Sequence, residues 1–128
     1  MKSVLDTSVL LGPEPGPLDG ELAISSASLA ELHFGVLVAR ADDVRAERLR
    51  RLALIEQRFA PLPIDDHVAR HYGRLAAATV AAGRKPRTRA VDLLIAATAV
   101  AHGARLLTRN AADLAGLDHL VEIVDLTA

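Results

Sequence analysis

The sequence has no cysteine and no tryptophan, and aromatic residues make up only 2% of the chain. The lack of cysteine excludes disulfide bonds, thiolate zinc sites and a cysteine nucleophile. The hydrophobic fraction is nevertheless 51%, so alanine, leucine and valine must fill the core. Neither sign of charge is in excess, since the formal net charge is -1. Any attraction to nucleic acid must therefore come from local basic patches and not from the overall field.

Long apolar runs are also lacking, because no run of the sequence reaches the length needed to span a membrane. The opening MKSVLDTS leaves no room for the charged and apolar regions of a secretory signal. We therefore expect a cytoplasmic protein with no membrane contact. The length of 128 residues predicts a single domain over residues 1–128 with a core of its own.

Short apolar segments alternate with longer helical patterns along the chain. Strands are expected at residues 4–5, 21–24, 61–64, 104–107 and 121–124, and helices at about 27–39, 42–59, 65–83 and 89–102. The proline- and glycine-rich segment 12–20 is expected to be a surface loop. This alternation predicts an α/β fold, with a parallel, twisted, doubly wound sheet of about five short strands and helices on both faces.

Asp6 directly follows the first strand and is itself followed by Thr7 and Ser8. Open α/β sheets place their chemistry just outside the carboxyl ends of the strands, which makes Asp6 a candidate site residue. Asp6 can also be explained as a cap of the next helical turn. The position alone does not separate these two roles.

Two helical segments are apolar on nearly every side, as buried helices are. Glu31 interrupts one of them and Asp92 the other. A buried carboxylate needs a cation, a hydrogen-bond network or a metal ion. Glu31 can alternatively face a water-filled groove or pair with an arginine, and Asp92 can gain about 0.3–1 kcal/mol from the dipole of its helix. Thr88 is expected to cap the helix that carries Asp92.

Asn110 and Asp113 follow the strand at 104–107, at the sheet edge where Asp6 is expected. Their spacing matches a capping box, in which Asn110 caps a short helix and Asp113 returns to the amide of Asn110. For Asp113, that structural role and a role in a site both remain open.

Asp6, Glu31 and Asp92, with Asp113 as a fourth candidate, indicate a cation site. Carboxylates brought together repel one another unless a cation neutralises them. Oxygen ligands without sulfur favour Mg²⁺ or Mn²⁺, which activate water and stabilise charge on a phosphoryl oxygen. The basic residues near these acids in the sequence would hold a polyanion by its phosphates; they are Arg84, Lys85, Arg87, Arg89 and Arg109. The pattern indicates hydrolysis of a phosphodiester.

Four motifs resemble those of the PIN-domain ribonucleases and, within them, the VapC-type toxins of bacterial type II toxin–antitoxin systems. The motifs are LDTSVLL around Asp6, SLAEL around Glu31, AVDLLIAATAVAHGARLLTRN around Asp92, and the trailing NAADL. The resemblance covers the whole chain and implies a three-layer PIN-like fold. It also implies that Asp6 and Asp92 are the principal metal ligands and Glu31 the third acid, supported by polar side chains that include Thr7, Ser8, Thr108 and Asn110.

The same resemblance implies a Mg²⁺- or Mn²⁺-dependent endoribonuclease that forms a homodimer and is inhibited by a cognate VapB-type antitoxin. Many relatives carry an acid where this chain has Asn110, and others have the arrangement seen here, with Asp113 as the nominal fourth acid. We expect a water-mediated role at the metal for Asp113 and a capping role for Asn110. The alternative function is that of a catalytically inactive PIN-like module that binds RNA or protein. The intact acids at positions 6, 31 and 92 argue against it.

Overall fold

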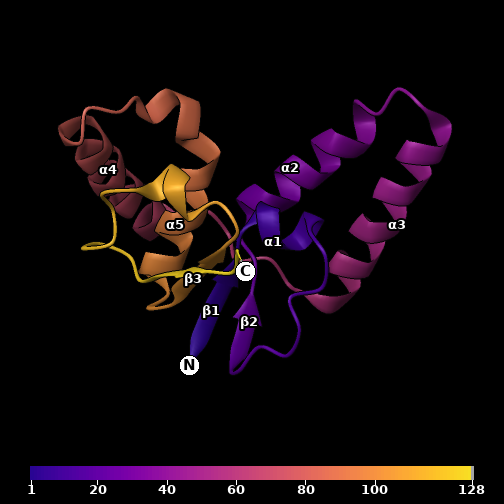
Figure 1. Ribbon diagram of the computed structural model, residues 1–128, viewed down its shortest axis with the longest axis horizontal. Helices are drawn as coiled ribbons and strands as arrows, with labels where there is room; N and C mark the ends of the chain where they lie inside the picture. The colour runs from indigo at the N-terminus through magenta and orange to yellow at the C-terminus, as the bar shows by residue number, and fades with distance from the viewer. Residues whose placement is uncertain (128) are drawn as a thin grey trace.

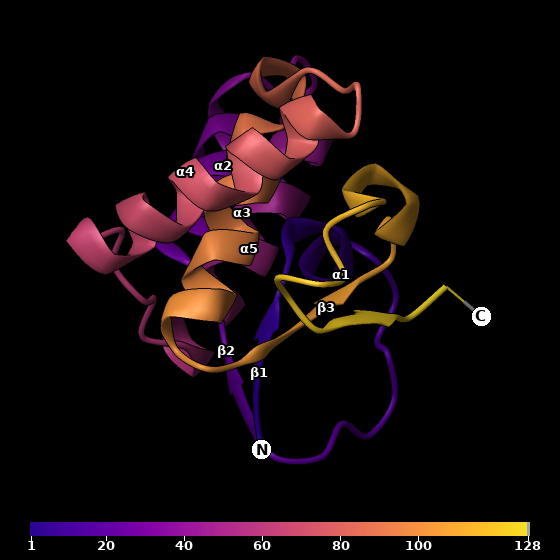
Figure 2. The same ribbon diagram turned by 90° about the vertical axis from the view of Figure 1, so that its left-hand side faces the viewer.

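The structure is a computed structural model that describes residues 1–127 (Figures 1 and 2). The elements in chain order are β1 (Lys2–Leu5), α1 (Thr7–Leu11), β2 (Glu21–Ala23), α2 (Ser26–Leu37), α3 (Asp42–Arg58), α4 (Asp66–Ala81), the 3₁₀ helix η1 (Pro86–Arg89), α5 (Ala90–Ala101), β3 (Arg105–Thr108), the 3₁₀ helix η2 (Ala111–Leu114) and β4 (Ile123–Asp125). The expected loop at residues 12–20 contains no helix or strand.

The sheet is parallel throughout and has the strand order β2-β1-β3-β4. In its register, Val4 pairs with Ala23 on one side and with Leu106 on the other. The parallel architecture is confirmed, but the fifth strand expected at residues 61–64 is absent, since this segment forms only an isolated bridge between Leu62 and Ser25. Pro61 and Pro63 flank the bridge, and proline has no N–H group with which to extend a ladder.

Helices cover both faces of the sheet, which confirms the three-layer arrangement. Consecutive strand residues point to opposite faces, so Val4 and Leu106 join a core with α4 and α5, whereas Leu5 and Leu107 join a core with α1, α2 and α3. Figure 1 shows the α2–α3 pair on one side of the molecule and the α4–α5 pair on the other, with the strands below them. Within residues 1–127 no helix is long and apolar enough to cross a membrane.

One side of the second half of α2 is exposed, although the sequence predicted a helix buried on nearly every side. The exposed fractions are 66% at Phe34, 78% at Leu37 and 49% at Val38. Val44 and Leu49 of α3 are exposed as well. Since α2 and α3 extend away from the sheet, their far halves have only each other to pack against (Figure 1). We call the α2–α3 pair the arm.

Helix starts were predicted partly correctly. The Ser25 hydroxyl accepts a hydrogen bond from Ala27 N, and the Asp65 carboxylate accepts one from Val68 N, so these side chains cap α2 and α4. The expected Thr88 cap is wrong, because the Thr88 hydroxyl donates to the carbonyl of Lys85 within η1. Proline at the start of η1 fixes a helical φ, and the chain therefore turns before α5 begins.

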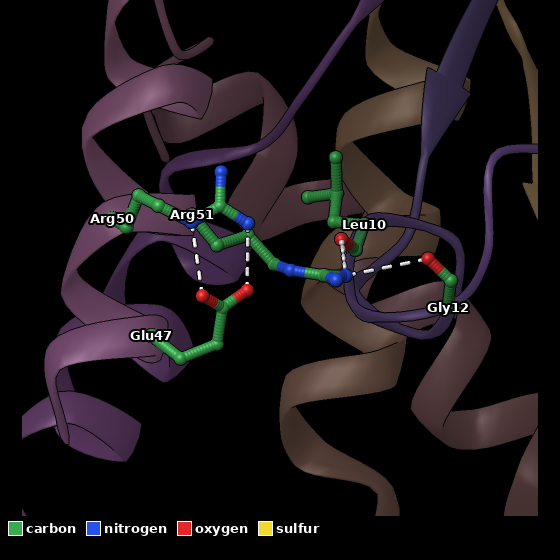
Figure 3. Close-up of polar contacts among 5 residues, drawn as sticks. All are labelled: Leu10, Gly12, Glu47, Arg50 and Arg51. Carbon is green, nitrogen blue, oxygen red and sulfur yellow. Dashed lines mark hydrogen bonds and ion pairs between the residues drawn. The ribbon is translucent and has the colours of Figure 1, made fainter. Parts of the chain in front are cut away.

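The side chain of Arg51 fastens the arm to α1 (Figure 3). Arg51 of α3 donates to the carbonyl oxygens of Leu10 at 3.2 Å and Gly12 at 3.3 Å, while its neighbour Arg50 forms an ion pair with Glu47. A cavity of about 610 Å³ lies beside this contact, between the loop at residues 12–20 and α3. None of the four candidate acids lines that cavity.

Candidate functional site

The four candidate acids come from four separate elements that meet at the carboxyl edge of the sheet. Asp6 joins β1 to α1, Glu31 lies in α2, Asp92 lies in the first turn of α5, and Asp113 lies in η2, just beyond β3. The parallel register aligns the ends of β1 and β3, which brings the segments that follow them together. The charges of the other three acids all influence the Asp92 carboxyl, so the four form one electrostatic cluster.

Asp6 is buried and makes its hydrogen bonds through a single carboxylate oxygen. Its Oδ1 atom accepts from Val9 N at 3.2 Å and from the Ser8 hydroxyl at 2.5 Å. Asp6 is therefore the N-cap of α1, which confirms the capping role that the sequence allowed. No hydrogen bond to Oδ2 is found within residues 1–127. That oxygen remains available to a ligand, so the two explanations are compatible.

Ser8 connects the ends of β1 and β3. Its hydroxyl donates to Asp6 and accepts from Arg109 N at 2.9 Å, with the Thr108 hydroxyl 3.5 Å away. Thr108 is fully buried and accepts from Asn110 N at 2.9 Å. Ser8 and Thr108 thus fix the orientation of Asp6 relative to the start of η2.

Glu31 is held by a hydroxyl and not by an arginine. The Thr7 hydroxyl donates to Glu31 Oε1 at 2.5 Å and lies 3.1 Å from Oγ of Ser28. Ser28 is fully buried and stands one turn before Glu31 on α2. Sequence reasoning did not single out Ser28, although its i, i+3 spacing from Glu31 places both side chains on one helix face.

The carboxyl of Asp92 is perturbed by its surroundings. Burial raises the pKa of its carboxyl above the ordinary value. The negative charges of Glu31, Asp6 and Asp113 raise the pKa of that carboxyl further. Arg89 has the opposite, smaller effect on the pKa of Asp92. A cation placed among these acids would remove the repulsion that raises this pKa.

Asp113 forms an ion pair with Arg89, with 2.9 Å between Oδ1 and the guanidinium. The capping box expected with Asn110 is wrong, because Asn110 is exposed and its side chain makes no capping bond. The amide of Asp113 instead donates to the main-chain oxygen of Asn110 at 3.0 Å. A single 3₁₀ turn satisfies that amide through the backbone and leaves the Asn110 side chain without a donor to cap.

Three of the five basic residues expected to hold RNA bind the chain itself. Arg84 donates to the carbonyls of Ala112 and Asp113, and Arg109 donates to the carbonyl of Pro13. The third is Arg89, through its ion pair with Asp113. The remaining two, Lys85 and Arg87, are exposed. Turn carbonyls attract arginine as phosphates do, and the sequence does not distinguish these two uses.

The donor set fits a hard divalent cation, although the acids do not form a ready-made cage. No three of the histidine, aspartate and glutamate side chains in residues 1–127 converge closely enough to hold an ion as they stand. Each of three acids has its own partner: Asp6 has Ser8, Glu31 has Thr7, and Asp113 has Arg89. Carboxylates repel one another when no cation lies between them, which favours such a spread.

Comparisons with known proteins agree with this geometry. The family model for the PIN domain matches residues 3–119. Ribonuclease VapC5 from Mycobacterium tuberculosis is 40% identical over 121 residues, which cover 90% of this chain and 87% of that protein. Ribonuclease VapC4 of the same organism is 39% identical over 115 residues, covering 85% and 86%. The crystal structure of VapBC-5 from M. tuberculosis, a member of the VapBC family of toxin-antitoxin systems, matches with a TM-score of 0.85 and 36% identity over 97% of this chain and 98% of that chain.

Proposed function

This chain belongs to the PIN-domain family, in its VapC branch, and on that premise we propose that it is a ribonuclease that needs a divalent cation to hydrolyse RNA. The observation that carries the proposal is the coupling of Asp92 to Glu31, Asp6 and Asp113 at one edge of the sheet. Repulsion within such a cluster destabilises the folded protein when no cation is bound. Its occurrence in a chain with ribonuclease relatives supports a working site.

Asp6, Glu31 and Asp92 would hold Mg²⁺ or Mn²⁺, which suit oxygen ligands. When bound, the ion supplies a water nucleophile at neutral pH and stabilises charge on the phosphoryl oxygen. The protein's own contribution is to orient the acids. Ser8 holds one oxygen of Asp6, and Thr7 holds one oxygen of Glu31. The partial burial of Asp92 strengthens its attraction for a cation.

The partner of this chain is a VapB-type antitoxin, as the VapBC-5 structure supports. An inhibitor that occupies a cluster of carboxylates must bring positive charge, and a guanidinium can bind two carboxylate oxygens at once. We therefore expect an arginine of the antitoxin to enter the site. We also propose that the chain forms a homodimer and acts in the cytoplasm.

RNA cleavage by the purified chain tests the proposed function. We expect cleavage of a mixed RNA substrate in Mg²⁺ or Mn²⁺, complete loss on chelation, and recovery when the ion is restored, because the acids bind substrate poorly without a cation. The cognate antitoxin should suppress the same activity. RNA binding without cleavage at any ion concentration would instead establish the inactive binding module.

Substitutions at positions 110 and 113 separate two roles that the sequence left open. Asp113→Ala is expected to weaken metal binding and slow cleavage by roughly 10- to 100-fold, as loss of a group that supports metal ligands does. Asn110→Ala is expected to change stability by less than about 0.5 kcal/mol, because its exposed side chain caps nothing. Metal titration, cleavage rates and urea unfolding of both variants provide the measurements. A larger loss of activity for Asn110→Ala than for Asp113→Ala would reverse the assignment.

A further inference from the structure

Arg89 is the cation that this acidic cluster already carries. It stands directly before α5, one turn ahead of Asp92, and its guanidinium contacts Asp113. Within the described part of the chain, residues 1–127, no other basic side chain forms an ion pair with any of the four acids. Arg89 thus pairs with one acid of the site and precedes a second, Asp92, by one helical turn.

The local structure holds the two partners of this ion pair in place. On one side, η1 is stiffened by Pro86 and by the hydrogen bond from the Thr88 hydroxyl to the Lys85 carbonyl. On the other side, Arg84 fixes η2 through the carbonyls of Ala112 and Asp113. The facing side chains of Arg89 and Asp113 are still 27% and 42% exposed. An ion pair this accessible to water contributes little to folding, and it remains open to exchange.

We propose that Arg89 is an exchangeable counter-ion, which pairs with Asp113 until a divalent cation binds and then transfers to a phosphate of the RNA. The proposal rests on the proposed metal-dependent function. The guanidinium and the divalent cation compete for the single negative charge of Asp113. Binding of the divalent cation therefore weakens the ion pair between Arg89 and Asp113. The released guanidinium is well suited to a phosphate, because its planar fork binds two oxygens at once.

This exchange predicts that loss of the Arg89 charge changes the affinity for Mn²⁺ and the kcat/KM for RNA in opposite directions. Arg89→Ala removes a positive charge from the cluster, so Mn²⁺ should bind more tightly, by about 3- to 10-fold. The same variant loses its contact to the phosphate, so kcat/KM for RNA at saturating Mn²⁺ should fall by about 10- to 100-fold. A purely structural residue would weaken both processes together. A rise in Mn²⁺ affinity together with a fall in kcat/KM therefore identifies the exchange.

The full-length chain without antitoxin provides the test, with Mn²⁺ affinity measured by calorimetry and cleavage at saturating Mn²⁺. Arg89→Lys keeps the charge but not the fork, so it should leave Mn²⁺ affinity near that of the wild type and still reduce kcat/KM. Arg70→Ala is the matched control, because Arg70 forms a similar 3.1 Å ion pair with Asp66 in the first turns of α4, at the end away from η1. It should change neither quantity.

Unchanged or weaker Mn²⁺ binding by Arg89→Ala would overturn the exchange, as would an unchanged kcat/KM. If Arg89→Ala does not fold, the kcat/KM of Arg89→Lys is the deciding measurement. A wild-type kcat/KM for Arg89→Lys would then overturn the exchange. A wild-type chain that neither binds Mn²⁺ nor cleaves RNA would instead overturn the proposed function and the exchange with it. Failure of the exchange alone leaves wild-type cleavage intact, so the two failures are distinguishable.

Discussion

Asp92→Asn is expected to reduce RNA cleavage by at least about 100-fold, the loss seen when one preorganised electrostatic group is removed from an active site. The same change should stabilise the metal-free protein at neutral pH. Burial and the neighbouring acids raise the pKa of Asp92 in the folded state. Ionising this carboxyl in the folded protein therefore opposes folding, and asparagine has no charge to ionise.

The stabilisation by Asp92→Asn should depend on pH in a defined direction. In the unfolded chain the pKa of Asp92 is near its ordinary value of 3.8. Between that value and the raised pKa, the folded protein binds more protons than the unfolded chain, so the wild-type free energy of unfolding falls as the pH rises. The advantage of the variant should be absent below the ordinary pKa of Asp92 and fully present once the pH exceeds its raised pKa.

Urea unfolding in chelator at several pH values, together with cleavage assays in Mn²⁺, measures both effects. Asp6→Asn is a suitable companion variant, because asparagine also caps helices well and should preserve α1. It should lose activity to a similar extent without unfolding. Metal-dependent cleavage at the wild-type rate by either variant would contradict the assignment of these acids.

Leu93→Ala should have the opposite effect on stability, although Leu93 is the next residue on the same helix. The Leu93 side chain is fully buried in the core between α4, α5 and the sheet. Its truncation leaves a cavity and should cost about 2–5 kcal/mol of the free energy of unfolding. That is a large part of the total stability of a domain of this size, which is about 5–15 kcal/mol.

Urea unfolding at neutral pH in chelator measures this loss. Val80→Ala on α4 is the matched control, because Val80 is 60% exposed and its truncation should change stability by no more than about 0.5 kcal/mol. A loss below about 1 kcal/mol for Leu93→Ala would show that α5 is not the packing centre that its burial indicates.

The sequence predicted those parts of the fold and site that depend on local order along the chain. Asp6 follows a strand, and Asp92 begins an apolar helix, and both facts are visible in a few neighbouring letters. Parallel pairing then brings the ends of β1 and β3 to one edge of the sheet. These are short-range patterns combined with one general rule of topology.

Features that depend on distant partners were not predictable in this way. The apolar letters of α2 do not reveal that Phe34 and Leu37 lie beyond the reach of the sheet. The basic turn before α5 does not reveal that Arg84 and Arg89 bind η2, because those partners lie more than twenty residues away in sequence. The predicted cap by the Asn110 side chain was wrong for a different reason. The amide of Asp113 already donates to the main-chain oxygen of Asn110.

The contact of Arg51 with the end of α1 links the arm to the acidic site. A helix of five residues has too few internal hydrogen bonds to persist unaided. Asp6 stabilises its first turn, and Arg51 satisfies carbonyls at its far end. The free energy that keeps α1 folded, and Asp6 correctly oriented, is therefore supplied in part by a helix that contributes no acid to the site. A change that breaks the Arg51 contact is therefore expected to loosen α1 and, with it, the orientation of Asp6.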